Sequence, residues 1–391
     1  MVLVFLQAVA VAVIKKSTIA LVALYVIINN QSHAAVLAED RIDVLYHNYD
    51  GGGITIDGPS VLVRKSIGNT TSISANYYID SISSASIDAI TQASSYNEKR
   101  TQKSISIDYL YDKSIMSYSY TNSTENDFEA VTHSFNISQE TFGGLSTISL
   151  GYSAGNNHIS KSTDNIFSQN ADTKDYRLSL SQVFTKNFLM GLTYEVITDE
   201  GFLNNPYRQV RYISPSDPNA TIFQDEKYPK TRTSNATSIN FRYYLPYRAA
   251  VYGGYRYFTD TWDIEADTFD IGYVHPYQNN WIFDVSLRFY SQTRASFFSS
   301  LFPFVDAQNY LASDKELSTF SSNAISAGAT YSIKKEKLSF FEKGTLNFYL
   351  DRFSYNYDDF LDTTVTGITP GTEPAYKFSA NVIRFYLSLW F

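Results

Sequence analysis

The chain has 391 residues, no cysteine, a formal net charge of −8, 32 tyrosines and 27 phenylalanines. The lack of cysteine excludes thiol catalysis, thiolate metal sites and disulfides, and the acidic balance gives no support for a nucleic-acid partner. So much tyrosine is unusual in a soluble domain. It is typical of membrane β-barrels, which place aromatic rings at both interfaces.

The first residues have the pattern of a targeting segment. Lys15 and Lys16 precede an apolar run from Ser17 to Ile28, and a polar stretch then ends in small residues at Ala34. A short positive region, a short apolar core and small residues before the cleavage point are typical of a secretory signal. The run is too short to span a bilayer. We therefore predict a cleavable signal peptide over residues 1–34 and one β-barrel domain over residues 35–391.

Downstream of the signal, apolar and polar residues alternate with a period of two, which predicts strands with two different faces. Turn residues separate about sixteen such segments, of roughly ten residues each. They are Asp40–Tyr49, Gly58–Lys65, Thr70–Asp80, Lys103–Tyr111, Ser114–Asn122, Phe128–Ser138, Leu145–Ala154, Lys174–Phe184, Asn187–Thr198, Ser234–Leu245, Arg248–Thr259, Ile264–His275, Trp281–Ser291, Ser318–Ile333, Leu338–Tyr355 and Lys377–Phe391.

The last predicted strand, Lys377–Phe391, has the clearest alternation. Apolar residues recur at every second position back from the aromatic residue that ends the chain. This ending resembles the terminal strand of bacterial outer-membrane barrels, whose closing aromatic residue is read by the assembly machinery. We therefore expect the assembly machinery, outer-membrane lipid and lipopolysaccharide as partners.

The links between predicted strands alternate in length. Even-numbered links are tight, as in Asp112-Lys113 and Thr185-Lys186. Most odd-numbered links are longer, and the exceptions are Ser123–Asp127 and Asp260–Asp263. The longer links are Asp50–Asp57, Ser81–Gln102, Gly155–Thr173, Asp199–Thr233, Gln292–Leu317 and Asn356–Tyr376. This parity predicts an all-β fold, a transmembrane up-and-down antiparallel β-barrel with short periplasmic turns and long external loops. It places the protein in the outer membrane of a Gram-negative bacterium.

Charged residues within the predicted strands lie opposite the apolar stripes. An arginine facing lipid at mid-membrane costs about 2–4 kcal/mol, so these residues are predicted to face the lumen. They are Asp80, Asp108, Arg177, Glu195, Arg242, Arg256, Asp270, Asp284, Arg288, Asp351 and Arg384. Two interpretations stay open. The charges either pair across neighbouring strands and stiffen the wall, or they line a polar conduit that selects solutes by charge.

The link Asp199–Thr233 is too long to serve only as a turn. It contains Asp199, Glu200, Arg208 and Arg211. Opposed acidic and basic residues are what an electrostatic constriction requires, so one hypothesis folds this loop into the lumen. The alternative is an ordered external cap that only seals the barrel.

No metal, cofactor or catalytic site is predicted. Acidic residues cluster at Glu125–Glu129 and at Asp260–Asp267, but neither cluster has EF-hand spacing. Solvated loop tips, or tips bridged to lipopolysaccharide phosphates by divalent ions, are the favoured interpretation. The histidines of the mature chain, which are His47, His133, His158 and His275, lack zinc-ligand spacing. No nucleophile-elbow pattern accompanies them, so we do not expect an enzyme.

Six long motifs connect the chain to a known family: DGPSVLVRK (Asp57–Lys65), YYIDSISSASIDAITQASSYNEKR (Tyr77–Arg100), DEGFLNNPYRQVRY (Asp199–Tyr212), YPKTRTSNA (Tyr228–Ala236), YYLPYRAAVYGGYRYFTDTW (Tyr243–Trp262) and DKELSTF (Asp314–Phe320). In these motifs the chain resembles a bacterial family of predicted outer-membrane proteins catalogued as domain of unknown function 3570. The resemblance runs from about Asp40 to Phe391. It implies a barrel of unknown activity and gives no catalytic residues to carry over.

These patterns lead to one expected function and one alternative. The expected function is a pore or transporter for a small charged solute, with the Asp199–Thr233 loop narrowing the lumen. The alternative is a non-conducting scaffold or adhesion barrel whose loops bind an envelope or extracellular partner. An outer-membrane enzyme would instead require a histidine within hydrogen-bond reach of a serine or tyrosine in a cleft.

Overall fold

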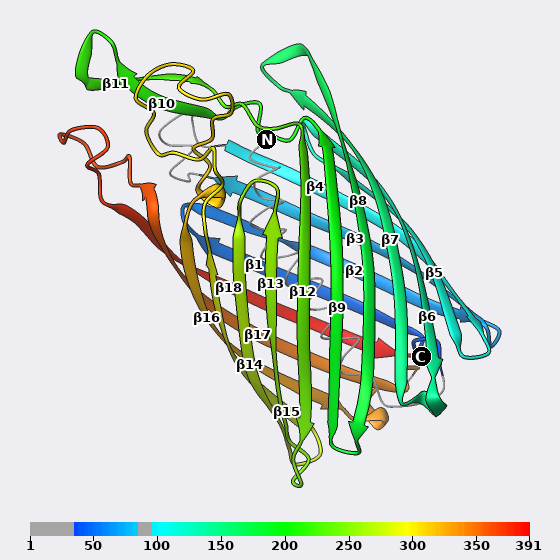
Figure 1. The fold of residues 1–391 in the computed structure, drawn as a ribbon. Helices are drawn as coiled ribbons and strands as arrows, with labels where there is room; N and C mark the ends of the chain where they lie inside the picture. Colours follow the sequence, from blue (N-terminus) through cyan, green and yellow to red (C-terminus); the bar gives the residue numbers. More distant parts are fainter. Residues whose placement is uncertain (1–34, 85–95, 339) are drawn as a thin grey trace.

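The computed structural model describes residues 35–84, 96–338 and 340–391. The predicted signal peptide lies outside the described residues. Sixteen strands form one closed antiparallel barrel, as predicted, and two further strands form a separate sheet (Figure 1). The barrel strands are β1 (Arg41–Gly51), β2 (Ile54–Ile67), β3 (Thr71–Ser84), β4 (Tyr96–Tyr111), β5 (Ser114–Thr124), β6 (Phe128–Thr141), β7 (Ser146–Lys161), β8 (Asp164–Thr185), β9 (Phe188–Gly201), β12 (Thr231–Tyr244), β13 (Ala250–Asp260), β14 (Glu265–Tyr277), β15 (Trp281–Gln292), β16 (Phe320–Ile333), β17 (Lys343–Leu361) and β18 (Ala375–Trp390).

The barrel closes where the first strand pairs with the last. β1 and β18 are antiparallel over eleven residue pairs, from Arg41 opposite Trp390 to Gly51 opposite Ala380. Closure leaves no sheet edge within the barrel, so the backbone donors and acceptors of its strands have partners on both sides. Within the described residues, no helix is long and apolar enough to cross a membrane.

One glycine of the first family motif is required by this packing. A Cβ atom placed on Gly58 in β2 would lie 1.9 Å from the carbonyl oxygen of Ile79 in β3. No side chain fits at that distance, because real Cβ atoms do not approach a backbone oxygen so closely. The glycine of DGPSVLVRK is therefore explained by close strand approach.

The two faces of each strand separate by polarity, as the alternation predicts. In β15, Phe283, Val285, Leu287 and Phe289 are between 40 and 49% exposed, while the side chains between them are half-buried. An outward apolar band of this kind is typical of barrels that lie in a membrane. The alternating polar residues face the interior of the barrel.

The observed strands are longer than predicted at the end of the barrel that carries the long loops. Most of the predicted loop Gly155–Thr173 is strand, and only residues 162–163 separate β7 from β8 (the green hairpin rising at upper right in Figure 1). Likewise, β1 and β2 take up most of the predicted loop Asp50–Asp57. Apolar residues are sparse there, and Ile54, Ile56 and Ile159 are buried rather than outward-facing, so the long lipid-facing alternation is missing. Hairpin pairing still satisfies the backbone.

The β15–β18 region also differs from the predicted boundaries. Lys335–Lys337 forms a short 3-10 helix, η3, and β17 begins only at Lys343 and continues to Leu361. Another 3-10 turn, η1 (Phe142–Gly144), joins β6 to β7, and η2 (Lys315–Leu317) precedes β16.

The predicted loop Ser81–Gln102 is partly strand, so Glu98, Lys99 and Arg100 belong to β4, and residues 85–95 lie outside the described residues.

The remaining long loops gather over one side of the barrel rim. We call residues 202–230, 261–264, 293–319 and 362–374 the cap. Within it, β10 (Gln209–Ser214) and β11 (Asp217–Asp225) form a hairpin that projects beyond the barrel (upper left in Figure 1). Isolated backbone bridges join this hairpin region to the β15–β16 loop, at Tyr212 with Phe302 and at Lys227 with Leu311. Val210, Phe302 and Leu311 form a small buried core beneath it.

Candidate functional site

Asp80 in β3 is a deeply buried carboxylate of the inner wall, only 1% exposed. Arg100 lies directly opposite on β4, with its Nε atom 3.1 Å from Asp80 Oδ2. His47 on β1 places Nε2 2.8 Å from Asp80 Oδ1 and 3.1 Å from the Tyr78 hydroxyl. The His47 and Tyr78 rings are stacked, with centroids 5.1 Å apart. Four side chains from three strands therefore form one cluster around a single carboxylate.

A second inner cluster is centred on Glu195 in β9. The Arg177 guanidinium, from β8, donates to Glu195 Oε1 from Nε at 3.2 Å and also contacts Asp175 at 3.1 Å. Arg256, from β13, donates to the other oxygen of Glu195 at 3.2 Å. Two cations thus share one carboxylate on the inner wall, which is the cross-strand pairing that stiffens a sheet.

Other predicted lumen residues also pair with close neighbours. Arg384 in β18 donates to Asp351 in β17 at 2.6 Å, and Arg64 donates to Asp108 at 2.9 Å. The Tyr252 hydroxyl donates to Asp284 at 3.0 Å. For the remaining three predicted residues, the Arg242 guanidinium lies over the Tyr252 ring at 5.4 Å, and Asp270 occupies the position opposite Arg288 in the β14–β15 register.

The four residues predicted to oppose one another in the Asp199–Thr233 loop are not brought together. Asp199 and Glu200 belong to β9 in the wall, where Asp199 accepts a hydrogen bond from the Thr173 hydroxyl at 2.7 Å. Glu200, the next residue along, is exposed. Arg208 and Arg211 lie in the cap and pair with acids from other loops. The loop contributes its two arginines to the cap, and a lumen constriction stays a prediction.

Buried charges join the cap loops to one another. Arg211 forms an ion pair with Glu373 of the β17–β18 loop, and its Nε donates to the Ser300 carbonyl oxygen at 2.8 Å. Arg208 Nη1 lies 3.7 Å from Asp314 Oδ1 in the β15–β16 loop. Glu226 accepts a hydrogen bond from the Ser313 backbone N–H at 2.8 Å. Three separate loops therefore depend on one another for charge compensation.

Two carboxyl groups of the cap are shifted in opposite directions. Burial raises the pKa of Glu226 to about 7; Arg208 opposes this rise, and the Asp314 carboxylate adds to it. Burial also acts to raise the pKa of Glu373, but hydrogen bonds from Arg211 and from the backbone outweigh it and hold this pKa below its usual value. In the cap, the protonated form of Glu226 and the ionised form of Glu373 are therefore favoured.

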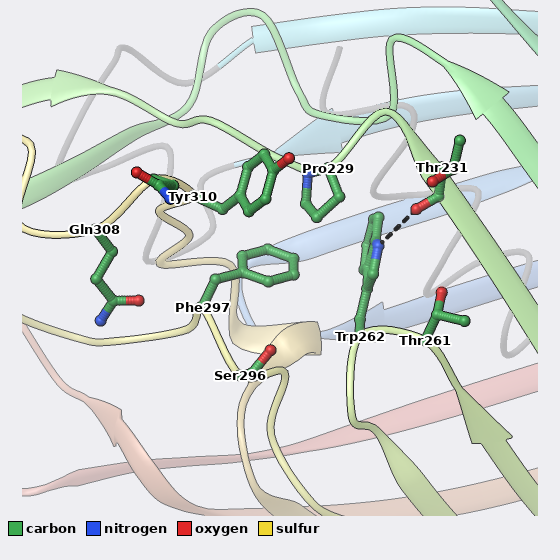
Figure 2. Close-up of a pocket in the computed structure, with 9 residues that line it drawn as sticks. Pro229, Thr231, Thr261, Trp262, Ser296, Phe297, Gln308 and Tyr310 are labelled. Carbon is green, nitrogen blue, oxygen red and sulfur yellow. Dashed lines mark hydrogen bonds between the residues drawn. The ribbon is translucent and has the colours of Figure 1, made fainter.

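An aromatic cavity of about 430 Å³ opens within the cap (Figure 2). Three rings from three loops, Tyr228, Trp262 and Phe297, meet with centroids 5.2–5.5 Å apart. We call these rings the aromatic triad. Trp262 and Phe297 line the cavity together with Tyr310 and with uncharged polar side chains. The volume falls in the range of about 300–1,000 Å³ typical of ligand pockets.

Sequence reasoning missed this cavity. Tyr228 and Trp262 both lie inside the family motifs, at the start of YPKTRTSNA and at the end of the motif from Tyr243, so a signal was present. The contact between them depends on how three loops fold together, which no periodicity encodes. Across residues 35–84, 96–338 and 340–391, no group of three or more His, Cys, Asp or Glu residues has a metal-binding arrangement.

A closed antiparallel barrel with an outward apolar surface and a charged interior defines the outer-membrane β-barrel class. Within that class, the sequence matches the model of one family over residues 89–358, described as protein of unknown function (DUF3570). This match covers more than half of the chain. The chain therefore belongs to the DUF3570 family.

Solved structures of similar fold share little sequence with this chain. A bacterial polysaccharide outer membrane secretin matches with a TM-score of 0.48 and 6% identity, covering 91% of this chain and 100% of that one. The outer membrane protein OpdK from Pseudomonas aeruginosa matches with a TM-score of 0.42 and 8% identity, covering 90% of this chain and 99% of that one. The siderophore receptor PirA from Pseudomonas aeruginosa matches with a TM-score of 0.41 and 10% identity, covering 91% of this chain but only 64% of the receptor. No curated protein matches the sequence.

Proposed function

We propose that this protein lies in the outer membrane of a Gram-negative bacterium and conducts a small charged solute through its barrel. The observation that carries the proposal is the inner wall, where charged side chains of both signs face the interior of a sixteen-strand barrel. Barrels of this size have an interior wide enough for water, and charged rings are how such pores select ions. Lipid, lipopolysaccharide and the barrel assembly machinery are the partners that this location implies.

The Glu195 cluster is the best place to test selectivity. One carboxylate serves two arginines there, so replacing it with an amide leaves an excess of positive charge on the inner wall. The variant Glu195→Gln should shift ion selectivity toward anions. The matched control is Asp306→Asn, which removes an acid that is exposed in the cap and paired with the exposed Lys227.

The experiment is reconstitution of the folded protein in planar bilayers, with reversal potentials measured in a salt gradient. We expect discrete conductance steps and a reversal potential that moves in Glu195→Gln but not in Asp306→Asn. Liposomes loaded with charged and neutral dyes would report solute passage in parallel. Absence of both conductance and dye release from the folded wild-type protein would contradict the proposal.

A second candidate function is a non-conducting scaffold that binds a partner through its external loops. The observation that favours it is the ordered cap, in which Arg211, Arg208 and Glu226 join three loops by buried polar contacts. A pore does not require loops that are tied together in this way. The bilayer experiment separates the two functions, because a scaffold gives neither conductance nor dye release.

A further inference from the structure

The cavity of the cap differs from the inner wall of the barrel in its chemistry. The wall is lined by charges, whereas none of the described residues that line the cavity is charged. They are aromatic rings, hydroxyl groups and amides, with Pro229 at one side (Figure 2). A ligand that fits them is neutral, and it must offer both apolar faces and many hydrogen-bonding groups.

The aromatic floor of the cavity is held in place from behind. Trp262 is 4% exposed, and its Nε1 donates to the Thr231 carbonyl oxygen at 3.0 Å. The Arg232 guanidinium lies 4.5 Å from the Trp262 ring centre and is itself paired with Asp260. The ring therefore has one fixed orientation, and a ligand does not need to order it. Preformed sites of this kind lose little conformational entropy on binding.

Phe297 and Tyr310 supply the apolar walls. Phe297 is 5% exposed and packs edge-on against Trp262 at 5.2 Å. Tyr310 is 46% exposed and meets Phe297 at 6.3 Å, so its ring lies at the mouth of the cavity. The face of an aromatic ring carries negative charge density and attracts weakly positive C–H groups. These rings therefore suit an aliphatic ring that presents C–H bonds rather than a flat anion.

The rim of the cavity is made of exposed uncharged polar side chains. Thr231, Thr261 and Ser296 contribute hydroxyl groups, and Gln308 and Asn309 contribute amides. Hydroxyl and amide groups each combine donor and acceptor capacity, which matches a ligand carrying several hydroxyl groups around a ring. A purely apolar ligand would leave these groups without new partners.

From this combination we infer that the cap binds a neutral sugar residue, with the sugar C–H face against Tyr310 and Phe297 and its hydroxyl groups at the polar rim. The site goes beyond conduction, because the cavity lies in the cap and its chemistry does not depend on whether the barrel is open. The same sugar chemistry occurs in free saccharides and in the polysaccharide of lipopolysaccharide. The test therefore includes both.

The test measures binding to the full barrel by tryptophan fluorescence. The chain has three tryptophans, so replacing Trp281 and Trp390 with phenylalanine leaves Trp262 as the only reporter. The protein is kept in a polyoxyethylene detergent, because glucoside and maltoside detergents carry the proposed ligand chemistry themselves. The probes are maltose, lactose, and purified lipopolysaccharide with and without its O-polysaccharide. Saturable quenching or enhancement by at least one of these probes is expected.

Tyr310→Ala should weaken the binding at least tenfold, because it removes the exposed ring at the mouth. The matched control is Tyr247→Ala, which removes a tyrosine that is 57% exposed at the opposite, short-turn end. Gel mobility of the unheated protein checks that both variants are folded. If only the disaccharides bind, the ligand is a free saccharide; if only lipopolysaccharide bearing O-polysaccharide binds, the ligand is the surface glycan.

Three results would overturn the inference. One is the absence of saturable binding by every sugar probe to the folded single-tryptophan protein. A second is unchanged affinity in Tyr310→Ala together with a normal gel shift. Binding of indole or benzyl alcohol in place of the sugars would also overturn it, because the rings would then recognise an aromatic ligand.

Discussion

The wall of the barrel and the cap above it are both held by buried charges, but the charges are connected in different ways. In the wall, Asp80 pairs with Arg100 directly opposite on the next strand. In the cap, Arg211 pairs with Glu373, 162 residues further along the chain. The wall is therefore stabilised by neighbours that the strand register already brings together. The cap is stabilised by contacts that require several loops to be in place.

The largest effect is expected at the most buried cluster of the wall. Asp80→Asn removes the carboxylate that His47 and Arg100 share, and breaking a buried ion pair by removing one partner costs about 3–5 kcal/mol. We expect a loss of this size in the free energy of unfolding, measured by urea titration in detergent. The exposed control Asp306→Asn should change it by less than about 0.5 kcal/mol. Equal effects of the two substitutions would show that the cluster does not stabilise the wall.

The cap should respond to pH through Glu226. Its pKa is about 7 in the folded protein against 4.5 for the free group, so the folded cap binds the proton more tightly than the open cap. Cap stability therefore falls as pH rises from about 4.5 to 7, by on the order of 2–3 kcal/mol.

Hydrogen exchange of the β10 and β11 amides measures this change, after correction for intrinsic rates at each pH. We expect faster opening at pH 8 than at pH 5 in the wild type and no such dependence in Glu226→Gln. Asp225→Asn, an exposed neighbour, is the matched control and should behave as the wild type. A pH dependence that persists in Glu226→Gln would assign the effect to another group.

A smaller and opposite effect is expected at Glu373. Its pKa is held below the usual value, so its contribution to cap stability is present above about pH 4.5 and is lost as pH falls through the lowered pKa. A double-mutant cycle with Arg211→Gln and Glu373→Gln should give a coupling energy of about 1–2 kcal/mol from β10–β11 exchange at pH 7. Additive single effects would mean that the two loops are not coupled through this pair.

The smallest effect is expected at the short-turn end of the wall, opposite the cap. Lys65 lies 4.8 Å from the ring centre of Phe391 and 2.5 Å from Asp40, with a side chain that is 59% exposed. Lys65→Met should lower the free energy of unfolding by less than about 1 kcal/mol. Lys113→Met, in an exposed turn of the same end, is the control. A loss comparable to that of Asp80→Asn would remove the distinction between buried and exposed pairs.

The strands of the wall can be predicted from the sequence alone because apolar and polar residues alternate along them. The alternation in Trp281–Ser291 gives both the strand and its outward face, and the charge at Arg288 then has to face inward. The β7–β8 extension is not predicted as strand because Asn156, Asn157 and His158 are all polar, which removes the alternation. The pattern also fails to predict the hairpin β10–β11, although Pro215 lies in the turn between its two strands.

The cap was beyond prediction for a different reason. The two arginines of the Asp199–Thr233 loop were recognised as important, but their partners, Asp314 and Glu373, lie in two other loops. Likewise, Trp262 and Phe297 are too far apart in sequence for any local rule to connect them. Contacts between loops depend on the rim that holds them, and one sequence gives no information about such long-range pairs.

The pairing of Arg211 with Glu373 has a consequence for biogenesis. Glu373 lies between β17 and β18, 162 residues after Arg211. Their ion pair therefore cannot form until synthesis has passed the β17–β18 loop. The β10–β11 hairpin reaches its fully paired state only when this distant loop is also in place.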